Sequence, residues 1–319
     1  MKRALVTGAA GFAGQWLCRA LLRDGWEVTG ASLTTPPPNG TLTDEERGAV
    51  RWMLADLRAE DAVADVLDAS APDAVFHLAG ISFVPAAREA PVTQTNVLSA
   101  VVMLADLKRR QAAGAIAPTV VIVGSAEQYG AHDTSEGPLT EHADCRPRTL
   151  YAASKAAQEV FALEAARADG LRVVCTRSFN HSGPGQASQF LIPSLVRRAL
   201  DARRAPAPRR ITIGNGHTTR DFLHAEDVAN AYLSLATRGV PGEVYNVCSG
   251  TGVTVEDLAR EVCARAGVEA DLESDPALRR AVDVPWLVGD HTKLRSTTGW
   301  TPRRSRTDII DDLLNAPSH

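Results

Sequence analysis

In the first half of the chain, short continuous apolar runs alternate with segments whose apolar residues recur at helical spacing. Short apolar runs rich in β-branched residues, such as "ALVT" and "TVVIVGS", are typical of buried strands. Each is followed by a segment whose apolar residues recur at helical spacing, as Trp16, Leu17, Ala20 and Leu21 do. The predicted strands lie near residues 4–7, 27–32, 50–54, 73–80, 118–125 and 171–176, and the predicted helices near residues 12–24, 59–70, 91–111 and 151–169. This alternation predicts a parallel, doubly wound sheet of the Rossmann type.

The regular alternation ends near residue 180. The later segments are short and mixed, and some are expected to return to the sheet. The rest are expected to form a smaller mixed α/β lobe over the carboxyl edge of the sheet, where open α/β sheets bind ligands. We therefore divide the chain into a dinucleotide-binding domain, residues 1–178, and a mainly substrate-binding lobe, residues 179–319. Residues 34–40, "TTPPPNG", are expected to form an extended surface loop because three prolines exclude helix.

Composition narrows the class of protein. The 319 residues are 45% hydrophobic and 23% charged, with a net charge of −4, which indicates an ordinary globular protein without the basic field of a nucleic-acid binder. The apolar runs are shorter than the roughly 18 residues of a membrane span, and the N-terminus lacks a signal-peptide pattern. The five cysteines are scattered, with no C-x-x-C pair. We expect a reduced, cytoplasmic protein without a metal site.

Gly8, Gly11 and Gly14 form G-x-x-G-x-x-G directly between the first strand and the first helix. Glycines at such a turn let the backbone approach a pyrophosphate, and the helix N-terminus favours its negative charge. A lone Gly-rich turn is weak evidence, but its place at the start of the chain predicts a dinucleotide site.

The cofactor is expected to be NADP(H), although NAD(H) is not excluded. The second strand ends in "VTGASLTT", which lacks the acidic residue that binds the ribose 2′-hydroxyl of NAD. Ser32 and Thr34 would tolerate a 2′-phosphate there, and Arg58 could approach it from the next loop. Asp56 is expected to accept a hydrogen bond from the adenine amino group, the alternative being a helix N-cap.

Tyr151 and Lys155 lie four residues apart, on one face of a predicted helix. A nearby lysine cation can lower the pKa of a tyrosine and help it to relay a proton. Y-x-x-x-K alone arises by chance in many helices, but here Ser125 ends the preceding strand and can hold a substrate oxygen. The trio predicts an oxidoreductase rather than a dinucleotide sensor, which has no need of a proton donor.

With these motifs, the chain resembles the extended short-chain dehydrogenases/reductases that act on nucleotide sugars. The resemblance rests on "TGAAGFAG", "DAVFHLAG", "GSAEQYG", "YAASK" and "TRDFLHAEDV" and covers nearly the whole chain. It implies Tyr151 as general acid/base, Lys155 on the nicotinamide ribose and Ser125 on the sugar oxygen. The remaining residues expected around the cofactor are Phe12, Ala13, Leu57, Leu78, Ala79 and Phe179.

In this family the trio of Ser125, Tyr151 and Lys155 is shared by 4-ketoreductases, 4,6-dehydratases and 4-epimerases. Other residues must therefore distinguish these reactions. Many dehydratases carry Asp-Glu after the serine or threonine, and here Ala126 and Glu127 stand there, which leaves Glu127 as a further catalytic candidate. Some dehydratases that act on GDP-mannose also have only the glutamate, so this difference weakens the dehydratase alternative without excluding it. Residues 177–194, beginning "RSFNHSGPGQ", resemble GDP-4-keto-6-deoxy-D-mannose reductases, as do residues 245–250 and 275–302. We therefore predict NADPH-dependent reduction of a 4-keto-6-deoxy nucleotide sugar, with a dehydratase or epimerase as the alternative.

The resemblance also implies residues for the nucleotide sugar. Asn180 would contact the phosphates, Arg220 and Arg280 would hold the diphosphate or nucleotide, and Ser82 would lie near the hexose. Guanidinium groups suit phosphate because they bind it in a bidentate way. GDP is the favoured nucleotide. Two long helices, near residues 91–111 and 151–169, resemble the pair that forms a homodimer interface in this family, the alternative being that their apolar faces are wholly buried within the subunit.

Overall fold

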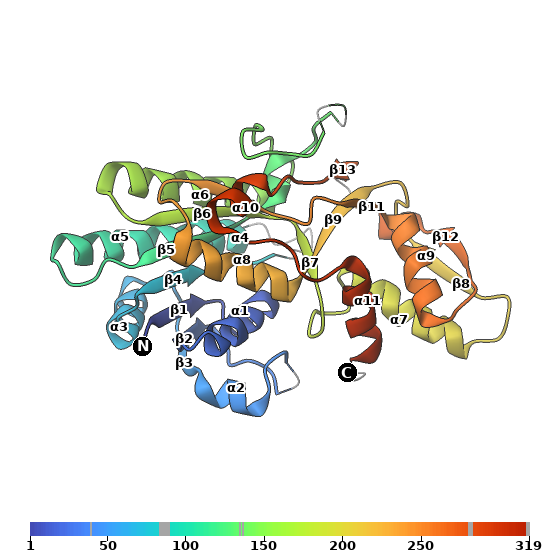
Figure 1. Cartoon of the computed structure of the whole chain (residues 1–319), viewed down its shortest axis with the longest axis horizontal. Helices are drawn as coiled ribbons and strands as arrows, with labels where there is room; N and C mark the ends of the chain where they lie inside the picture. The colour runs from blue at the N-terminus through green and yellow to red at the C-terminus, as the bar shows by residue number, and fades with distance from the viewer. Residues whose placement is uncertain (39, 83–89, 134, 136, 280–282, 317–319) are drawn as a thin grey trace.

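The structure, a computed structural model, describes residues 1–38, 40–82, 90–133, 135, 137–279 and 283–316. Its centre is a seven-stranded sheet in which every neighbouring pair is parallel, ordered β10-β6-β5-β4-β1-β2-β3 (Figure 1). The strands are β1 (Arg3–Thr7), β2 (Glu27–Ser32), β3 (Arg51–Leu54), β4 (Ala74–His77), β5 (Thr119–Ser125), β6 (Val173–Ser178) and β10 (Val244–Val247). The predicted Rossmann-type sheet is confirmed.

Helices cover both faces of this sheet. On one face α1 (Phe12–Arg23) packs against α8 (Ala225–Arg238), with α10 (Thr292–Thr298) beside α8. On the other face lie α3 (Glu60–Ser70), α5 (Ser99–Ala112) and α6 (Leu150–Asp169). Each layer has its own apolar core, because buried strands present apolar side chains to both sides. The helix predicted at residues 91–111 is found as one helical run of α4 (Ala90–Thr93), η1 (Gln94–Leu98) and α5.

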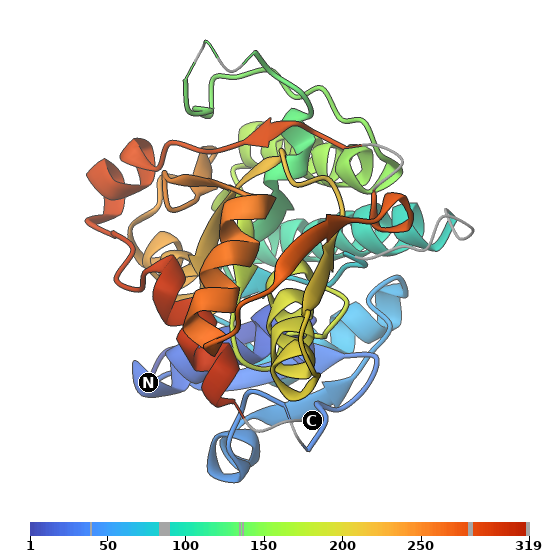
Figure 2. The same ribbon diagram turned by 90° about the vertical axis from the view of Figure 1, so that its right-hand side faces the viewer.

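A smaller lobe forms the other end of the molecule, turned toward the viewer in Figure 2. Its apolar core lies between α7 (Leu191–Arg204), α9 (Val255–Ala266) and α11 (Arg306–Asn315), beside the parallel pair β8 (Arg210–Ile213) and β12 (Asp271–Ser274). A third sheet carries the substrate-side segments. It contains β7 (Asn180–Ser182), β9 (Thr219–His224), β11 (Gly252–Thr254) and β13 (Trp286–Leu287). β10 comes after β9 and α8 in the sequence and returns to the large sheet beside β6.

The segment after β2 differs in part from its prediction. It contains a short helix, α2 (Asp44–Ala49), which the sequence reasoning did not predict. Its start is a capping box, in which the Thr43 hydroxyl accepts from the Glu46 amide and the Glu46 carboxylate accepts from the Thr43 amide. Across the residues described above, the helices all lack the length and apolarity that a bilayer crossing requires.

Candidate active site

The Gly-rich turn has the geometry of a phosphate cradle. Gly8 has a φ of +67°, and its amide donates to the Ala31 carbonyl at 2.8 Å. A Cβ on Gly14 would lie 2.3 Å from the Gly8 carbonyl oxygen, so only glycine lets α1 begin this close to the turn. Among the described residues, no side chain caps the N-terminus of α1. The turn therefore fits a dinucleotide diphosphate, which would supply the missing partner for the first amides of the helix.

The predicted cofactor residues lie along the carboxyl edge of the sheet. Phe12 and Ala13 open α1, and the Ser32 hydroxyl at the end of β2 accepts from the Ala10 amide at 2.9 Å. After β4 come Leu78 and Ala79, whose amides donate to the Thr7 carbonyl and the Thr7 hydroxyl. Leu57 and Phe179 are buried in apolar clusters, so their side chains serve packing.

Asp56 has a partner that the sequence did not predict. Its carboxylate receives the Arg58 guanidinium, with Nε 2.9 Å from Oδ1 and Nη2 2.6 Å from Oδ2. These hydrogen bonds are the main reason why the pKa of Asp56 lies below its ordinary value. The alternative of a helix N-cap is wrong, because Ala59 occupies that position of α3. The Ala55 amide bonds the Ser32 carbonyl at the end of β2, so the segment that leads to Arg58 starts beside β2. The Arg58 guanidinium itself is engaged by Asp56.

The four predicted catalytic residues come from adjacent elements. Ser125 ends β5 and caps η2 (Ala126–Tyr129), accepting from the Glu127 amide at 3.2 Å. Tyr151 stands at the start of α6 and is hydrogen-bonded to the Ser125 side chain. Burial raises the pKa of Tyr151 to about 12, the Ser125 hydrogen bond opposes the rise, and the charge of Glu127 adds to it. The phenol is therefore protonated at neutral pH.

Lys155 lies one turn after Tyr151 on α6 and is buried. Its Nζ donates to the Val123 carbonyl at 2.8 Å and to Gln158 Oε1 at 2.9 Å. Burial lowers the pKa of Lys155 to about 8. The contacts of Lys155 run to β5 and to Gln158, and Lys155 is not among the groups that shift the Tyr151 pKa. That Lys155 and the cofactor's ribose together lower this pKa stays a prediction.

A buried polar network, which the sequence reasoning missed, joins the strand that carries Ser125 to the helix that carries Tyr151. Gln128 accepts from the Ser125 amide at 2.9 Å and donates to Glu159 Oε2 at 2.9 Å. Glu159, one turn beyond Lys155, receives Arg177 of β6, with Nη2 2.7 Å from Oε1. The side chains of Glu159 and Arg177 are each only 9% exposed, so the two charges neutralise each other away from water.

The predicted substrate residues are placed unevenly. Asn180 begins β7, and its Nδ2 is buried without a partner among the described residues, which suits a ligand oxygen. Arg220 on β9 contacts Asp283 through Nη2 at 2.7 Å. Ser82 is exposed just after β4. Arg280 lies outside the described residues.

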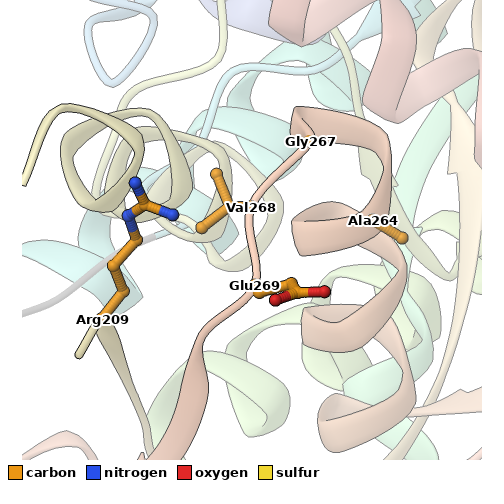
Figure 3. A pocket seen from close by; sticks show the side chains of 5 residues that line it. All are labelled: Arg209, Ala264, Gly267, Val268 and Glu269. Carbon is orange, nitrogen blue, oxygen red and sulfur yellow. The ribbon is translucent and has the colours of Figure 1, made fainter. Parts of the chain in front are cut away.

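A separate hollow lies on the smaller lobe. It has a volume of about 480 Å³ and is lined by Arg209, Ala264, Gly267, Val268 and Glu269 (Figure 3). These residues come from the end of α9 and the approach to β8, and none of them is a predicted cofactor or substrate residue. Throughout the described ranges, no cluster of three or more His, Cys, Asp or Glu side chains could hold a metal ion.

Comparison with known proteins agrees with this geometry. The chain matches the model of the family described as GDP-mannose 4,6 dehydratase over residues 5–313. It is 34% identical to the GDP-6-deoxy-D-mannose reductase of Pseudomonas aeruginosa, over 98% of this chain and 96% of the relative. It is 31% identical to a dTDP-glucose 4,6-dehydratase of Streptomyces niveus, over 98% and 91%.

Solved structures give the same result. RMD from Pseudomonas aeruginosa, complexed with NADPH, superimposes with a TM-score of 0.81 and 31% identity, covering 99% of this chain and 98% of that one. The fold and site define an NAD(P)-dependent oxidoreductase of the extended short-chain dehydrogenase/reductase class that acts on nucleotide sugars. Within that class, the chain belongs to the GDP-mannose 4,6 dehydratase family.

Proposed function

We propose that the protein reduces the C4 ketone of a nucleotide-linked 4-keto-6-deoxyhexose, with NADPH as the reductant. The proposed substrate is GDP-4-keto-6-deoxy-mannose, and the proposed product is GDP-rhamnose. The 34% identity to a GDP-6-deoxy-D-mannose reductase supports this choice, as does the likeness to a structure complexed with NADPH.

The surroundings of Ala126 favour a reductase over those dehydratases that carry the Asp-Glu pair. Ala126 is 1% exposed and packs with Tyr129, Leu139, Phe179, Cys248 and Leu287. Many dehydratases place a carboxylate at this position, and an ionised carboxylate in such an apolar cluster would be costly. Among the described residues, Glu127 is the acidic group whose charge raises the Tyr151 pKa, whereas acid/base elimination is better served by two groups of separated pKa.

Tyr151 is the proposed proton donor. A bound NADPH would supply the hydride for C4, and Tyr151 would donate its phenolic proton to the C4 oxygen as negative charge develops there. Ser125 donates a hydrogen bond to the same oxygen and so stabilises that charge. Lys155 holds the nicotinamide ribose beside them. Asn180 and Arg220 bind the diphosphate, and Arg220 exchanges its contact with Asp283 for the ligand.

Absorbance at 340 nm tests this reaction. When the purified protein and NADPH meet GDP-4-keto-6-deoxy-mannose, we expect stoichiometric loss of absorbance and formation of a 6-deoxyhexose. A 4,6-dehydratase or a 4-epimerase recycles its cofactor, so neither would consume NADPH. The presence of Glu127 beside Tyr151 keeps the dehydratase as the second candidate. Turnover of GDP-mannose with nicotinamide nucleotide retained through dialysis would establish it in place of the reductase.

We also propose that the enzyme works as a cytoplasmic homodimer. The outer faces of the long helices carry exposed apolar side chains, with Leu98 of η1 42% exposed and Val160 and Phe161 of α6 66% and 45% exposed. A self-complementary contact between two copies would cover them. Analytical ultracentrifugation tests this, and a Val160→Asp, Phe161→Asp variant should sediment as a monomer.

A further inference from the structure

The loop after β7 packs directly against α1. Trp16 of α1 donates its indole N–H to the Pro184 carbonyl at 3.2 Å, and the Thr41 hydroxyl donates to the same oxygen at 3.4 Å. Gly185 has a φ of +88°, and a Cβ there would lie 2.4 Å from Thr41 Oγ1. The close approach of the loop to Thr41 therefore requires glycine at this position.

A second contact joins the same two regions. The ring of His181 in β7 stacks on Phe12, the first residue of α1, with centroids 6.1 Å apart and planes 7° from parallel. His181 donates from Nδ1 to the Phe179 carbonyl at 3.1 Å, which fixes the orientation of the ring. Burial lowers the pKa of His181, so the ring is neutral and stacks without a charge to solvate.

Internal hydrogen bonds make β7 and its loop a unit. Gln186 donates to the His181 carbonyl at 3.0 Å and accepts from the Ser182 hydroxyl at 2.6 Å. Asn180, whose buried Nδ2 lacks a partner among the described residues, begins this unit. Packed and hydrogen-bonded groups therefore run without a break from the start of α1 to the strand that Asn180 begins.

We propose that the contacts of Phe12 with His181 and of Trp16 with Pro184, the α1–β7 junction, couple cofactor binding to nucleotide-sugar binding. A dinucleotide that occupies the N-terminus of α1 fixes Phe12 and Trp16, and these hold β7 in the position in which Asn180 meets the diphosphate. Coupling between two sites is reciprocal, so the nucleotide sugar tightens the cofactor by the same factor. This inference rests on the proposed function, because it assigns Asn180 to the substrate diphosphate.

Isothermal titration of GDP, with UDP as a second probe, measures the coupling with and without saturating NADP⁺. GDP carries no sugar to touch the nicotinamide, so any coupling must pass through the protein. We expect NADP⁺ to tighten GDP by about 5-fold or more, the lower end of usual allosteric coupling. In Trp16→Phe both ligands should still bind, but the factor should fall below about 2-fold, because the bond to Pro184 is lost.

Trp26→Phe is a matched control. Trp26 is 6% exposed and Trp16 is 7% exposed, and Trp26 also donates one indole hydrogen bond, to Asp24, away from the junction. This variant should keep the wild-type factor. If Trp16→Phe does not fold, His181→Leu, which removes the stacked ring, takes its place with the same expectation.

The coupling is overturned if NADP⁺ leaves the GDP affinity of the wild type unchanged. It is also overturned if Trp16→Phe and Trp26→Phe reduce the tightening of GDP by NADP⁺ equally. The proposed function survives either result if the 340 nm assay is positive. If neither GDP nor UDP binds under any condition, both the coupling and the assignment of Asn180 are wrong.

Discussion

The Ser125 side chain is hydrogen-bonded to Tyr151, although the first ends β5 and the second begins α6. The two groups meet because Gln128 ties the Ser125 amide to Glu159 on the same helix. Proton donation and oxygen binding are therefore prepared at one point of the sheet edge before a ligand arrives. Such preorganised donors cost no rearrangement during the reaction.

Tyr151→Phe removes the proton donor and leaves the ring. General acid catalysis contributes about 10²- to 10⁴-fold, so we expect kcat to fall by that factor while the Kd of NADPH stays within about 2-fold. Stopped-flow absorbance and fluorescence titration measure the two quantities. Full turnover by this variant would show that another group donates the proton.

The lowered pKa of Lys155 predicts a pH dependence of cofactor binding. The amine is a cation below about pH 8 and neutral above it, so NADPH affinity should weaken as pH rises through 8. Titrations between pH 6.5 and 9.5 should show this break in the wild type, and Lys155→Met should bind more weakly with no break. A break that persists in Lys155→Met belongs to a different group.

The lowered pKa of Lys155 also affects stability, which should rise with pH, whereas NADPH affinity should fall. The unfolded lysine keeps its proton up to its ordinary pKa of 10.5, so between pH 8 and 10.5 the unfolded chain binds more protons than the folded one. The contribution of this group to the free energy of unfolding therefore rises with pH across that window.

Arg58 is the cation that we expect to hold the cofactor's 2′-phosphate. It and Asp56 are each about 40% exposed, so their contact can open at little cost. Arg58→Gln should lower the ratio of kcat/KM for NADPH to that for NADH by about 10-fold, because a charge-assisted bond is lost. Arg51→Gln, on the neighbouring strand β3, should leave the ratio unchanged. An unaltered ratio in Arg58→Gln would assign the 2′-phosphate to other groups.

The buried pair of Glu159 and Arg177 predicts a large loss of stability on breaking it. Glu159→Gln leaves the Arg177 guanidinium buried without a counter-charge, which typically costs about 3–5 kcal/mol of unfolding free energy. Urea unfolding followed by circular dichroism measures the change. Glu243→Gln, which breaks the more exposed pair with Lys293, serves as the control and should have little effect. Similar midpoints for both variants would mean that Arg177 finds other partners.

Local patterns predicted the elements that position the site. The sequence predicts β1, the turn and α1 because a continuous apolar run and a helical pattern meet at Gly8 and Gly14. It predicts α6 from the segment that begins at Tyr151 and is closed by Gly170. Helix α2 could also have been found, since Thr43 and Glu46 form the usual capping signature. The prolines just before α2 indicated a loop instead.

Long-range polar pairs were beyond sequence reasoning. Gln128 meets Glu159 only because η2 turns back beside α6, and Arg177 reaches Glu159 from β6, which pairs with β5. Arg58 illustrates the same limit at short range, because its spacing allowed either a ligand or Asp56 as its partner. Side-chain pairing depends on packing that periodicity does not encode.

The position of β10 in the large sheet has a consequence for biosynthesis. A nascent chain that has left the ribosome only as far as α7 lacks the strand that pairs with β6, so β6, which is buried in the complete fold, is left as an edge strand. Open strand edges are templates for association with other chains. We therefore expect a fragment that ends before β10 to aggregate more readily than the whole chain.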